Sequence, residues 1–212
     1  MFNYAFVDWD NTIYNTVAFE TDIFNIFGRY GASLADIKKT FLKSLCTVSP
    51  HHYDYTFEEH AQFLRDLGYA LPPTVEAELT ALFSKDYIFA DTVSFLQFLK
   101  SISKNVILLS AGDENFQMHK INGSHIVSHF DEVIIVGGDK EKYLINNYNE
   151  EKIFFVNDNV HENTLVVKEA PFATVITKFN TVRYTEDQVK EVGVPYFKTL
   201  TEIKQYVEQQ IK

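Results

Sequence analysis

Residues 6–13 read Phe-Val-Asp-Trp-Asp-Asn-Thr-Ile, and this stretch decides the fold. An apolar run over residues 4–7 passes directly into two carboxylates, Asp8 and Asp10. Such a run is typical of a strand buried on both faces, as in a parallel sheet covered by helices. Ligands bind outside the carboxyl ends of the strands in open α/β sheets, so both carboxylates are expected to face a site. A spacing of two in extended chain puts the two side chains on the same side.

The rest of the chain repeats the pattern of this first run. Further apolar runs, rich in β-branched residues, occupy positions 105–109, 132–136, 152–156 and 173–176. Helical patterns lie between and after these runs, at residues 92–102, 140–148, 163–168 and 201–211. Alternating strands and helices predict right-handed crossovers and an α/β fold, with a Rossmann-like, doubly wound parallel sheet.

The gap between the first two runs is unusual. Residues 8–104 are too many for a single crossover and too apolar for a loop. Four helical patterns occupy most of this gap, at residues 16–30, 34–45, 56–67 and 75–83, and the third begins with a capping box at Thr56. We therefore expect an α/β core of residues 1–15 and 90–212, and an inserted α-helical domain of residues 16–89.

The ends of the other predicted strands supply polar groups that suit phosphate chemistry. Ser110 precedes Ala111 and Gly112, and a hydroxyl beside backbone amides at a helix start can hold phosphate oxygens. Lys140 is placed to offset negative charge, and Asp158 is placed to bind Mg²⁺ with the first carboxylate. Each group also has an ordinary alternative: an N-cap for Ser110, a solvated surface for Lys140 and a turn around Asp158.

The carboxylate pair itself suits phosphoryl transfer. One carboxylate can attack phosphorus and form an aspartyl-phosphate, and the other can protonate the leaving oxygen and then deprotonate water. A phosphate dianion and an ionised aspartate repel each other, so this chemistry needs Mg²⁺ and a lysine. The alternative for the Asp-Asn pair at residues 10–11 is an ordinary turn at the strand exit.

Residues 6–13, Ser110, Lys140 and residues 155–162 together resemble the four sequence motifs of the haloacid dehalogenase-like hydrolase superfamily. The resemblance covers the whole chain, and the inserted helices correspond to the cap domain of one branch of that family. It implies that Asp8 is the nucleophile and that Asp10 is the general acid/base. Phosphatases and phosphomutases of the family carry an acid at the Asp10 position, whereas its dehalogenases lack one, so Asp10 favours phosphoryl transfer.

The resemblance also implies how substrate and metal are held. The implied ligands are Ser110, Ala111, Gly112 and Lys140 for the phosphoryl group, and Asp8, Asp158 and the backbone carbonyl of Asp10 for Mg²⁺. Three neighbouring residues, Thr12, Asn157 and Glu162, are expected to support these ligands.

The chain departs from the family pattern at three positions. Asn157 stands where the fourth motif usually has Gly or Asp, and Glu162 replaces the second Asp of that motif. The longer Glu162 side chain is expected to reach a metal-bound water rather than the metal. Lys142 competes with Lys140 for the place of the site lysine, and we favour Lys140.

Aromatic residues are frequent in the inserted segment, at Phe19, Phe24, Phe27, Tyr53, Tyr55 and Phe57. We expect them to form the core of the helical domain, and the alternative is a pocket for a base or another flat group. Two histidines, His51 and His52, lie in a predicted loop, which is either solvated or in contact with substrate.

The sequence therefore predicts a Mg²⁺-dependent phosphatase for a small phosphorylated metabolite. A phosphomutase that shares the first step and a binding or regulatory protein without turnover are the alternatives. A net charge of −10 argues against a nucleic-acid partner, because phosphate backbones need a basic surface. No stretch approaches the length of a membrane span, and the N-terminus has no basic leader, so we expect a cytoplasmic protein without membrane contact. The single cysteine, Cys46, leaves no internal disulfide framework.

Overall fold

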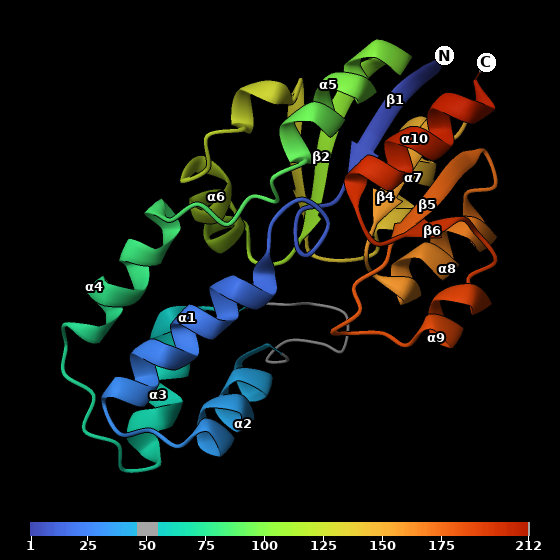
Figure 1. Ribbon diagram of the computed structural model, residues 1–212. Coiled ribbons are helices and arrows are strands. Elements are labelled where there is room, and N and C mark those ends of the chain that lie inside the picture. Colours follow the sequence, from blue (N-terminus) through green and yellow to red (C-terminus); the bar gives the residue numbers. More distant parts are fainter. Residues whose placement is uncertain (46–54, 212) are drawn as a thin grey trace.

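The computed structural model describes residues 1–45 and 55–211, so the predictions for Cys46, His51, His52 and Tyr53 lie outside the described residues. Within them, six parallel strands form one sheet in the order β3-β2-β1-β4-β5-β6 (Figure 1). The strands are β1 (Phe2–Val7), β2 (Ser103–Ala111), β3 (Glu132–Val136), β4 (Ile153–Asn157), β5 (Ala173–Lys178) and β6 (Tyr196–Phe197). This topology confirms the predicted doubly wound α/β sheet.

Helices cover both faces of the sheet. One layer contains α5 (Thr92–Ile102) and α10 (Leu200–Gln210), and the other contains α7 (Lys140–Tyr148) and α8 (Val160–Glu169). Side chains of successive strand residues point to opposite faces. On β1, Ala5 and Val7 therefore pack in the core with α5 and α10, whereas Phe6 packs with α7 and α8. Burial on both sides explains the apolar runs of the central strands β1 and β4.

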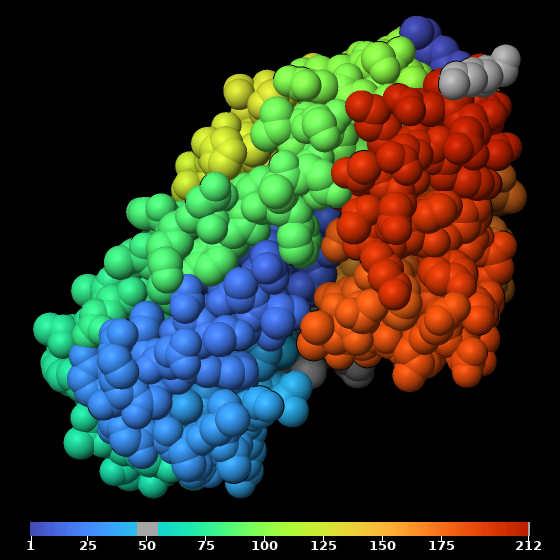
Figure 2. Space-filling view, in the orientation of Figure 1, coloured from blue at the N-terminus to red at the C-terminus, as the bar shows by residue number. Residues whose placement is uncertain are grey.

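A separate group of helices, which we call the helical lobe, lies at the carboxyl edge of the sheet. It consists of α1 (Thr16–Arg29), α2 (Leu34–Leu45), α3 (Phe57–Asp66), α4 (Val75–Thr80) and the 3₁₀ turn η1 (Ala81–Ser84). Figure 2 shows the lobe extending away from the sheet and its covering helices. Most of the aromatic residues predicted to form its core are buried as expected, namely Phe19, Phe27, Tyr55 and Phe57.

The two connections between lobe and sheet run side by side. The Asn15 N–H donates to the Tyr87 carbonyl at 2.7 Å, and the Phe89 N–H donates to the Ile13 carbonyl at 3.1 Å. Tyr14 also forms an isolated bridge with Ile88. The chain therefore leaves and re-enters the α/β part at one place. The division into domains at residues 15/16 and 89/90 stays a prediction.

Several elements differ from the sequence prediction. The expected helix over residues 75–83 is α4 followed by η1, and the short strand β6 was not expected. Two helices, α6 (Glu114–Asn122) and α9 (Glu186–Glu191), were also not predicted. In α6 the reason is visible in its burial, because Gln117 and Lys120 are buried on a face where apolar residues would signal a helix. No helix in residues 1–45 and 55–211 is both long enough and apolar enough to span a membrane.

A buried histidine joins two helices of the lobe. His60 is fully buried, its Nε2 lies 3.1 Å from the Ile37 carbonyl, and its Nδ1 lies 2.9 Å from the Tyr55 hydroxyl. Because a carbonyl can only accept, Nε2 carries the proton and Nδ1 accepts from Tyr55. Burial lowers the pKa of His60 from 6.5 to about 4, and the Ile37 carbonyl opposes this shift only in part. The lobe therefore holds His60 in its neutral form.

This burial predicts a pH-dependent loss of stability. The contribution of neutral His60 is complete above pH 6.5 and is lost as the pH falls towards 4, because the unfolded chain binds the proton more tightly. Between pH 7 and pH 4, wild type should lose about 3 kcal/mol more unfolding free energy than His60→Gln. Urea unfolding of both proteins at several pH values measures the difference. Parallel pH dependences would contradict the assignment.

Candidate active site

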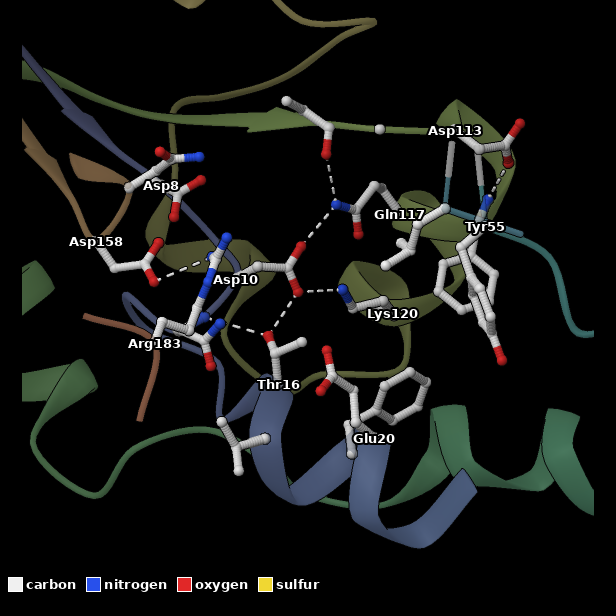
Figure 3. Close-up of a pocket in the computed structure, with 18 of the residues that line it drawn as sticks. Asp8, Asp10, Thr16, Glu20, Tyr55, Asp113, Gln117, Lys120, Asp158 and Arg183 are labelled. Atoms are coloured by element: carbon white, nitrogen blue, oxygen red, sulfur yellow. Dashed lines mark hydrogen bonds and ion pairs between the residues drawn. The ribbon is translucent and has the colours of Figure 1, made fainter. Parts of the chain in front are cut away.

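The carboxyl edge of the sheet and the helical lobe enclose a cavity of about 410 Å³. Strand ends line one part of it with polar residues, and α1 and α2 line another part with apolar ones. Figure 3 shows Asp10 near the middle, with Asp8 and Asp158 on one side and Gln117 and Lys120 on the other. Asn11 has a left-handed backbone, with φ of 58°, which turns the chain sharply away from the sheet after Asp10. Asparagine tolerates this conformation better than most residues.

Asp8 lies at the end of β1 and is held by two donors. The Lys140 ammonium donates to Oδ1 at 2.6 Å, and the Thr12 hydroxyl donates to Oδ2 at 2.8 Å. Burial raises the pKa of Asp8, and the charge of Lys140 opposes this shift. The sharp turn at Asn11 brings the Thr12 hydroxyl back to Asp8, four residues earlier in the chain. Asp8 is thus fixed in one orientation at the base of the cavity.

Lys140 rather than Lys142 is the lysine of this site. Its side chain is 2% exposed and also contacts Glu162 Oε2 at 2.9 Å. The side chain of Lys142 is 62% exposed and pairs with Asp139 at the surface, at 2.8 Å. Both lie at the start of α7, so the sequence alone left the choice open.

Glu162 positions this lysine. Besides Lys140, its Oε2 accepts from the Asn157 side chain at 2.8 Å, and its Oε1 accepts from the Asn159 side chain at 3.1 Å. Protein donors thus contact both carboxylate oxygens of Glu162, and its expected contact with a metal-bound water stays a prediction. Asn157, which is a departure from the family pattern, is the donor that makes this arrangement possible.

Asp10 is surrounded by donors that sequence analysis did not identify. Its Oδ1 accepts from the Thr16 hydroxyl at 2.6 Å and from the Lys120 ammonium, and its Oδ2 accepts from the Gln117 amide at 2.7 Å. Burial alone would raise the pKa of Asp10, but the Lys120 charge and the three hydrogen bonds outweigh burial and lower this pKa. The sequence carried one signal for Gln117 and Lys120: residues three apart lie on the same face of a helix, so both could reach one acceptor.

Ser110 is the last residue but one of β2 and contacts the same glutamine. Its hydroxyl is fully buried and accepts from the Gln117 side chain at 3.1 Å. Ala111 and Gly112 line the cavity, as expected for residues near a bound phosphate. The Gly112 N–H donates to the Val136 carbonyl at 3.0 Å, so this backbone amide is already bound within the protein. The predicted contact of Gly112 with phosphate stays a prediction. Gly112 has φ of 139°, a conformation that favours glycine.

Asp158 follows β4 and faces Asp8 across the site. Its backbone N–H donates to the Thr12 hydroxyl at 3.0 Å, and Arg183 contacts its Oδ2 at 3.4 Å. Burial raises the pKa of Asp158 to about 7, and Asp8 contributes to this rise by repulsion, although Arg183 opposes it. Thr12 therefore ties the ends of β1 and β4 together and orients the Asp8 carboxylate.

The donor set fits Mg²⁺. Asp8 and Asp158 are two buried carboxylates whose pKa values are both raised, mainly by burial, and the charge of Asp8 adds to the rise at Asp158. A nearby cation would favour the ionised form of both. In the part of the chain that the structure describes, no group of three or more His, Cys, Asp or Glu side chains forms a metal cluster. The predicted set needs only two carboxylates, since Mg²⁺ retains waters and takes carbonyl and phosphate oxygens.

The fold and the site define an α/β protein whose acidic strand ends face an inserted helical lobe. No protein-family model and no curated protein matches the sequence. Solved structures do match. A putative haloacid dehalogenase-like hydrolase from Burkholderia xenovorans has a TM-score of 0.74 at 14% identity, with 100% of both chains covered. A putative β-phosphoglucomutase from Thermotoga maritima has a TM-score of 0.70 at 15% identity, covering 98% of this chain and 99% of that one.

Two more similar structures show how varied the neighbours are. The L-2-haloacid dehalogenase from Xanthobacter autotrophicus has a TM-score of 0.67 at 14% identity, covering 98% of this chain and 99% of that one. The putative HAD-hydrolase YfnB from Bacillus subtilis, bound to magnesium, has a TM-score of 0.64 at 13% identity, covering 97% of this chain and 98% of that one. The chain has the haloacid dehalogenase-like fold, as the sequence motifs predicted.

The bridging role of Thr12 predicts a measurable loss of stability. Thr12→Val preserves shape but leaves the Asp158 N–H and one oxygen of Asp8 buried without their partner. It should lower the unfolding free energy by about 2 kcal/mol. The matched control is Thr21→Val, because the exposed Thr21 hydroxyl contacts only its own helix at Val17. Urea unfolding measures both, and equal effects would contradict the role of Thr12.

Proposed function

We propose that the protein is a Mg²⁺-dependent phosphatase that hydrolyses a small phosphate monoester through an aspartyl-phosphate on Asp8. The observation that supports this most directly is the pair Asp8 and Asp10. Both carboxylates line one cavity, Asp8 beside the buried Lys140 and Asp10 beside the buried Lys120. Two carboxylates in different environments suit a nucleophile and an acid/base.

In the first step, an Asp8 oxygen forms a bond to phosphorus while the bond from phosphorus to the leaving oxygen breaks. Asp10 gives its proton to that oxygen, so that an alcohol departs. Lys120 favours the ionised form of Asp10, and the arriving phosphate dianion works in the opposite direction because like charges raise a carboxyl pKa. In this proposal Lys140, which lines the cavity beside Asp8, contacts a phosphoryl oxygen and offsets the repulsion between phosphate and Asp8. The family resemblance assigns Ser110 to the phosphoryl oxygens as well.

In the second step, water attacks phosphorus and the bond from phosphorus to the Asp8 oxygen breaks. Asp10, now ionised, takes the proton from water, and here the charge of Lys120 favours the form that is needed. Inorganic phosphate then leaves. Mg²⁺, held by Asp8, Asp158 and the Asp10 carbonyl, would neutralise phosphate charge when bound.

A phosphomutase is the second candidate, because a putative β-phosphoglucomutase shares the fold and the first step would be the same. The two functions differ in whether water or a substrate hydroxyl accepts the phosphoryl group. A dehalogenase also shares the fold, but it has no use for a second carboxylate that is held by three donors. A binding protein without turnover is the remaining alternative.

The decisive experiment is hydrolysis of p-nitrophenyl phosphate by wild type and Asp8→Asn, each with and without Mg²⁺. Wild type should turn over only with Mg²⁺, and Asp8→Asn should lose at least about 1,000-fold in kcat, because it removes the nucleophile. Circular dichroism of both proteins checks that the mutant folds. Normal turnover by Asp8→Asn would overturn the proposed mechanism. A folded wild type without turnover on any phosphate ester would favour the binding protein.

Substitution of Lys140 and of its neighbour Lys142 gives a second test of the proposed function. Lys140→Gln should lower kcat/KM for the same ester by about 100-fold or more, since it removes a buried charge beside the reacting atoms. Lys142→Gln is the matched control and should change kcat/KM by less than about twofold, because its ammonium lies at the surface with Asp139. Steady-state kinetics on folded protein decides, and equal losses in the two variants would contradict the assignment of Lys140.

A further inference from the structure

The part of the cavity away from the strand ends has apolar walls and one carboxylate. The walls come mainly from helical-lobe residues and from α6, namely Val17, Ile23, Phe41, Leu42, Leu45, Tyr55 and Phe116. Glu20 projects from α1 into this space, and Figure 3 shows its carboxylate pointing towards Lys120 and Asp10. If the phosphate lies at Asp8, this region receives the leaving group.

Glu20 has no hydrogen bond or ion pair among the described residues, although it lies near charged groups. The Lys120 ammonium is bound to Asp10, and Arg183 contacts Asp158. Burial raises the pKa of Glu20 to about 7, with Asp10 adding to the rise and Arg183 and Lys120 reducing it only in part. A half-buried carboxylate in this position is costly unless something else brings it a donor.

A second acceptor in the cavity also has no donor. Gln117 is 5% exposed, and its Oε1 is buried without a hydrogen-bond partner among the described residues. The orientation of its amide is fixed, because Nε2 faces Asp10 and the Ala111 carbonyl, which can only accept. The cavity therefore presents two unmatched acceptors, one of them charged, to whatever binds there.

The net charge of the cavity also favours a ligand that brings hydrogen-bond donors and positive charge. Its described lining contains six carboxylates, from Asp8, Asp10, Glu20, Asp113, Asp158 and Glu162, against three cations, from Lys120, Lys140 and Arg183. With all six carboxylates ionised, a bound Mg²⁺ leaves one negative charge in excess, and a phosphate dianion restores the excess to three. A positive charge on the substrate itself would reduce this repulsion. Aromatic walls also favour an ammonium group, through attraction to their ring faces.

We propose that the substrate is a phosphate monoester whose leaving group carries a primary ammonium on a short apolar stem, and that the Glu20 carboxylate is its counter-ion. This assignment rests on the proposed phosphatase function, which places the phosphate at Asp8. The ammonium has three N–H donors, so it can bond to Glu20 and also approach Gln117 Oε1. The apolar walls then contact the carbon stem. A hydroxyl in place of the ammonium supplies only one donor and no charge.

The test uses matched series of substrates on the whole protein with Mg²⁺. ω-Aminoalkyl phosphates with two to five carbons are compared with the ω-hydroxyalkyl and n-alkyl phosphates of equal length. At the best length, wild type should prefer the amine over the hydroxyl by at least about tenfold in kcat/KM. In Glu20→Gln, which is neutral and nearly isosteric, this preference should fall to about twofold or less. Glu58→Gln is the matched control, because it removes the same charge from an exposed position in α3 outside the cavity and should keep the preference.

A binding measurement separates this inference from the proposed function. The same comparison is made by calorimetric titration with ω-aminoalkyl and ω-hydroxyalkyl phosphonates, which the protein cannot hydrolyse. Turnover of p-nitrophenyl phosphate without any amine preference, or with a preference that Glu20→Gln retains, would overturn the ammonium assignment and leave the phosphatase standing. Absence of all turnover, together with amine-selective phosphonate binding that Glu20→Gln abolishes, would overturn the phosphatase and support the ammonium site. Absence of both turnover and selective binding would overturn both.

Discussion

The buried contact between Lys140 and Asp8 is the interaction on which the rest of the site depends. An aspartate at the end of a strand, surrounded by protein, would be neutral without a nearby cation, and a neutral carboxyl is a poor nucleophile. Lys140 comes from the start of α7, and it lies against Asp8 only because β1, β2 and β3 run parallel and end at the same edge. Glu162 of α8 then holds the lysine, and Asn157 of β4 donates to Glu162. Four elements distant in sequence thus meet in one network of charges.

The second carboxylate belongs to a different network, which joins the sheet to the helical lobe. Asp10 accepts from Gln117 and Lys120 of α6 and from Thr16, the first residue of α1. Separation of the two networks is chemically useful, because Lys140 and Lys120 each serve one carboxylate. A single shared lysine would couple the proton affinities of Asp8 and Asp10, whereas two lysines allow the proposed nucleophile and the proposed acid/base to have different pKa values.

The sequence alone predicted the strands and helices whose buried positions are mostly apolar. Strands buried on both faces are continuous apolar runs, and the helix at residues 92–102 has one clear apolar stripe, so both could be predicted. The periodicity of apolar residues did not predict α6, because the buried face of this helix carries Gln117 and Lys120. Their partner, Asp10, lies about a hundred residues away in the sequence. Motifs identified Asp8, Asp10, Ser110, Lys140 and Asp158. Arg183 and Glu20 belong to no motif, and only the folded chain places them at the cavity.

The position of Glu20 relative to Thr16 links the choice of leaving group to the chemistry. The two residues are four apart on α1, so they lie on the same face one turn from each other. Thr16 donates to Asp10, and Glu20 lines the part of the cavity that we propose receives the leaving group. Because Thr16 and Glu20 share one turn of α1, the proposed choice of leaving group and the placement of the proposed acid/base depend on the same segment of the chain. A leaving group that contacts Glu20 would lie close to Asp10, the group that we propose protonates its oxygen.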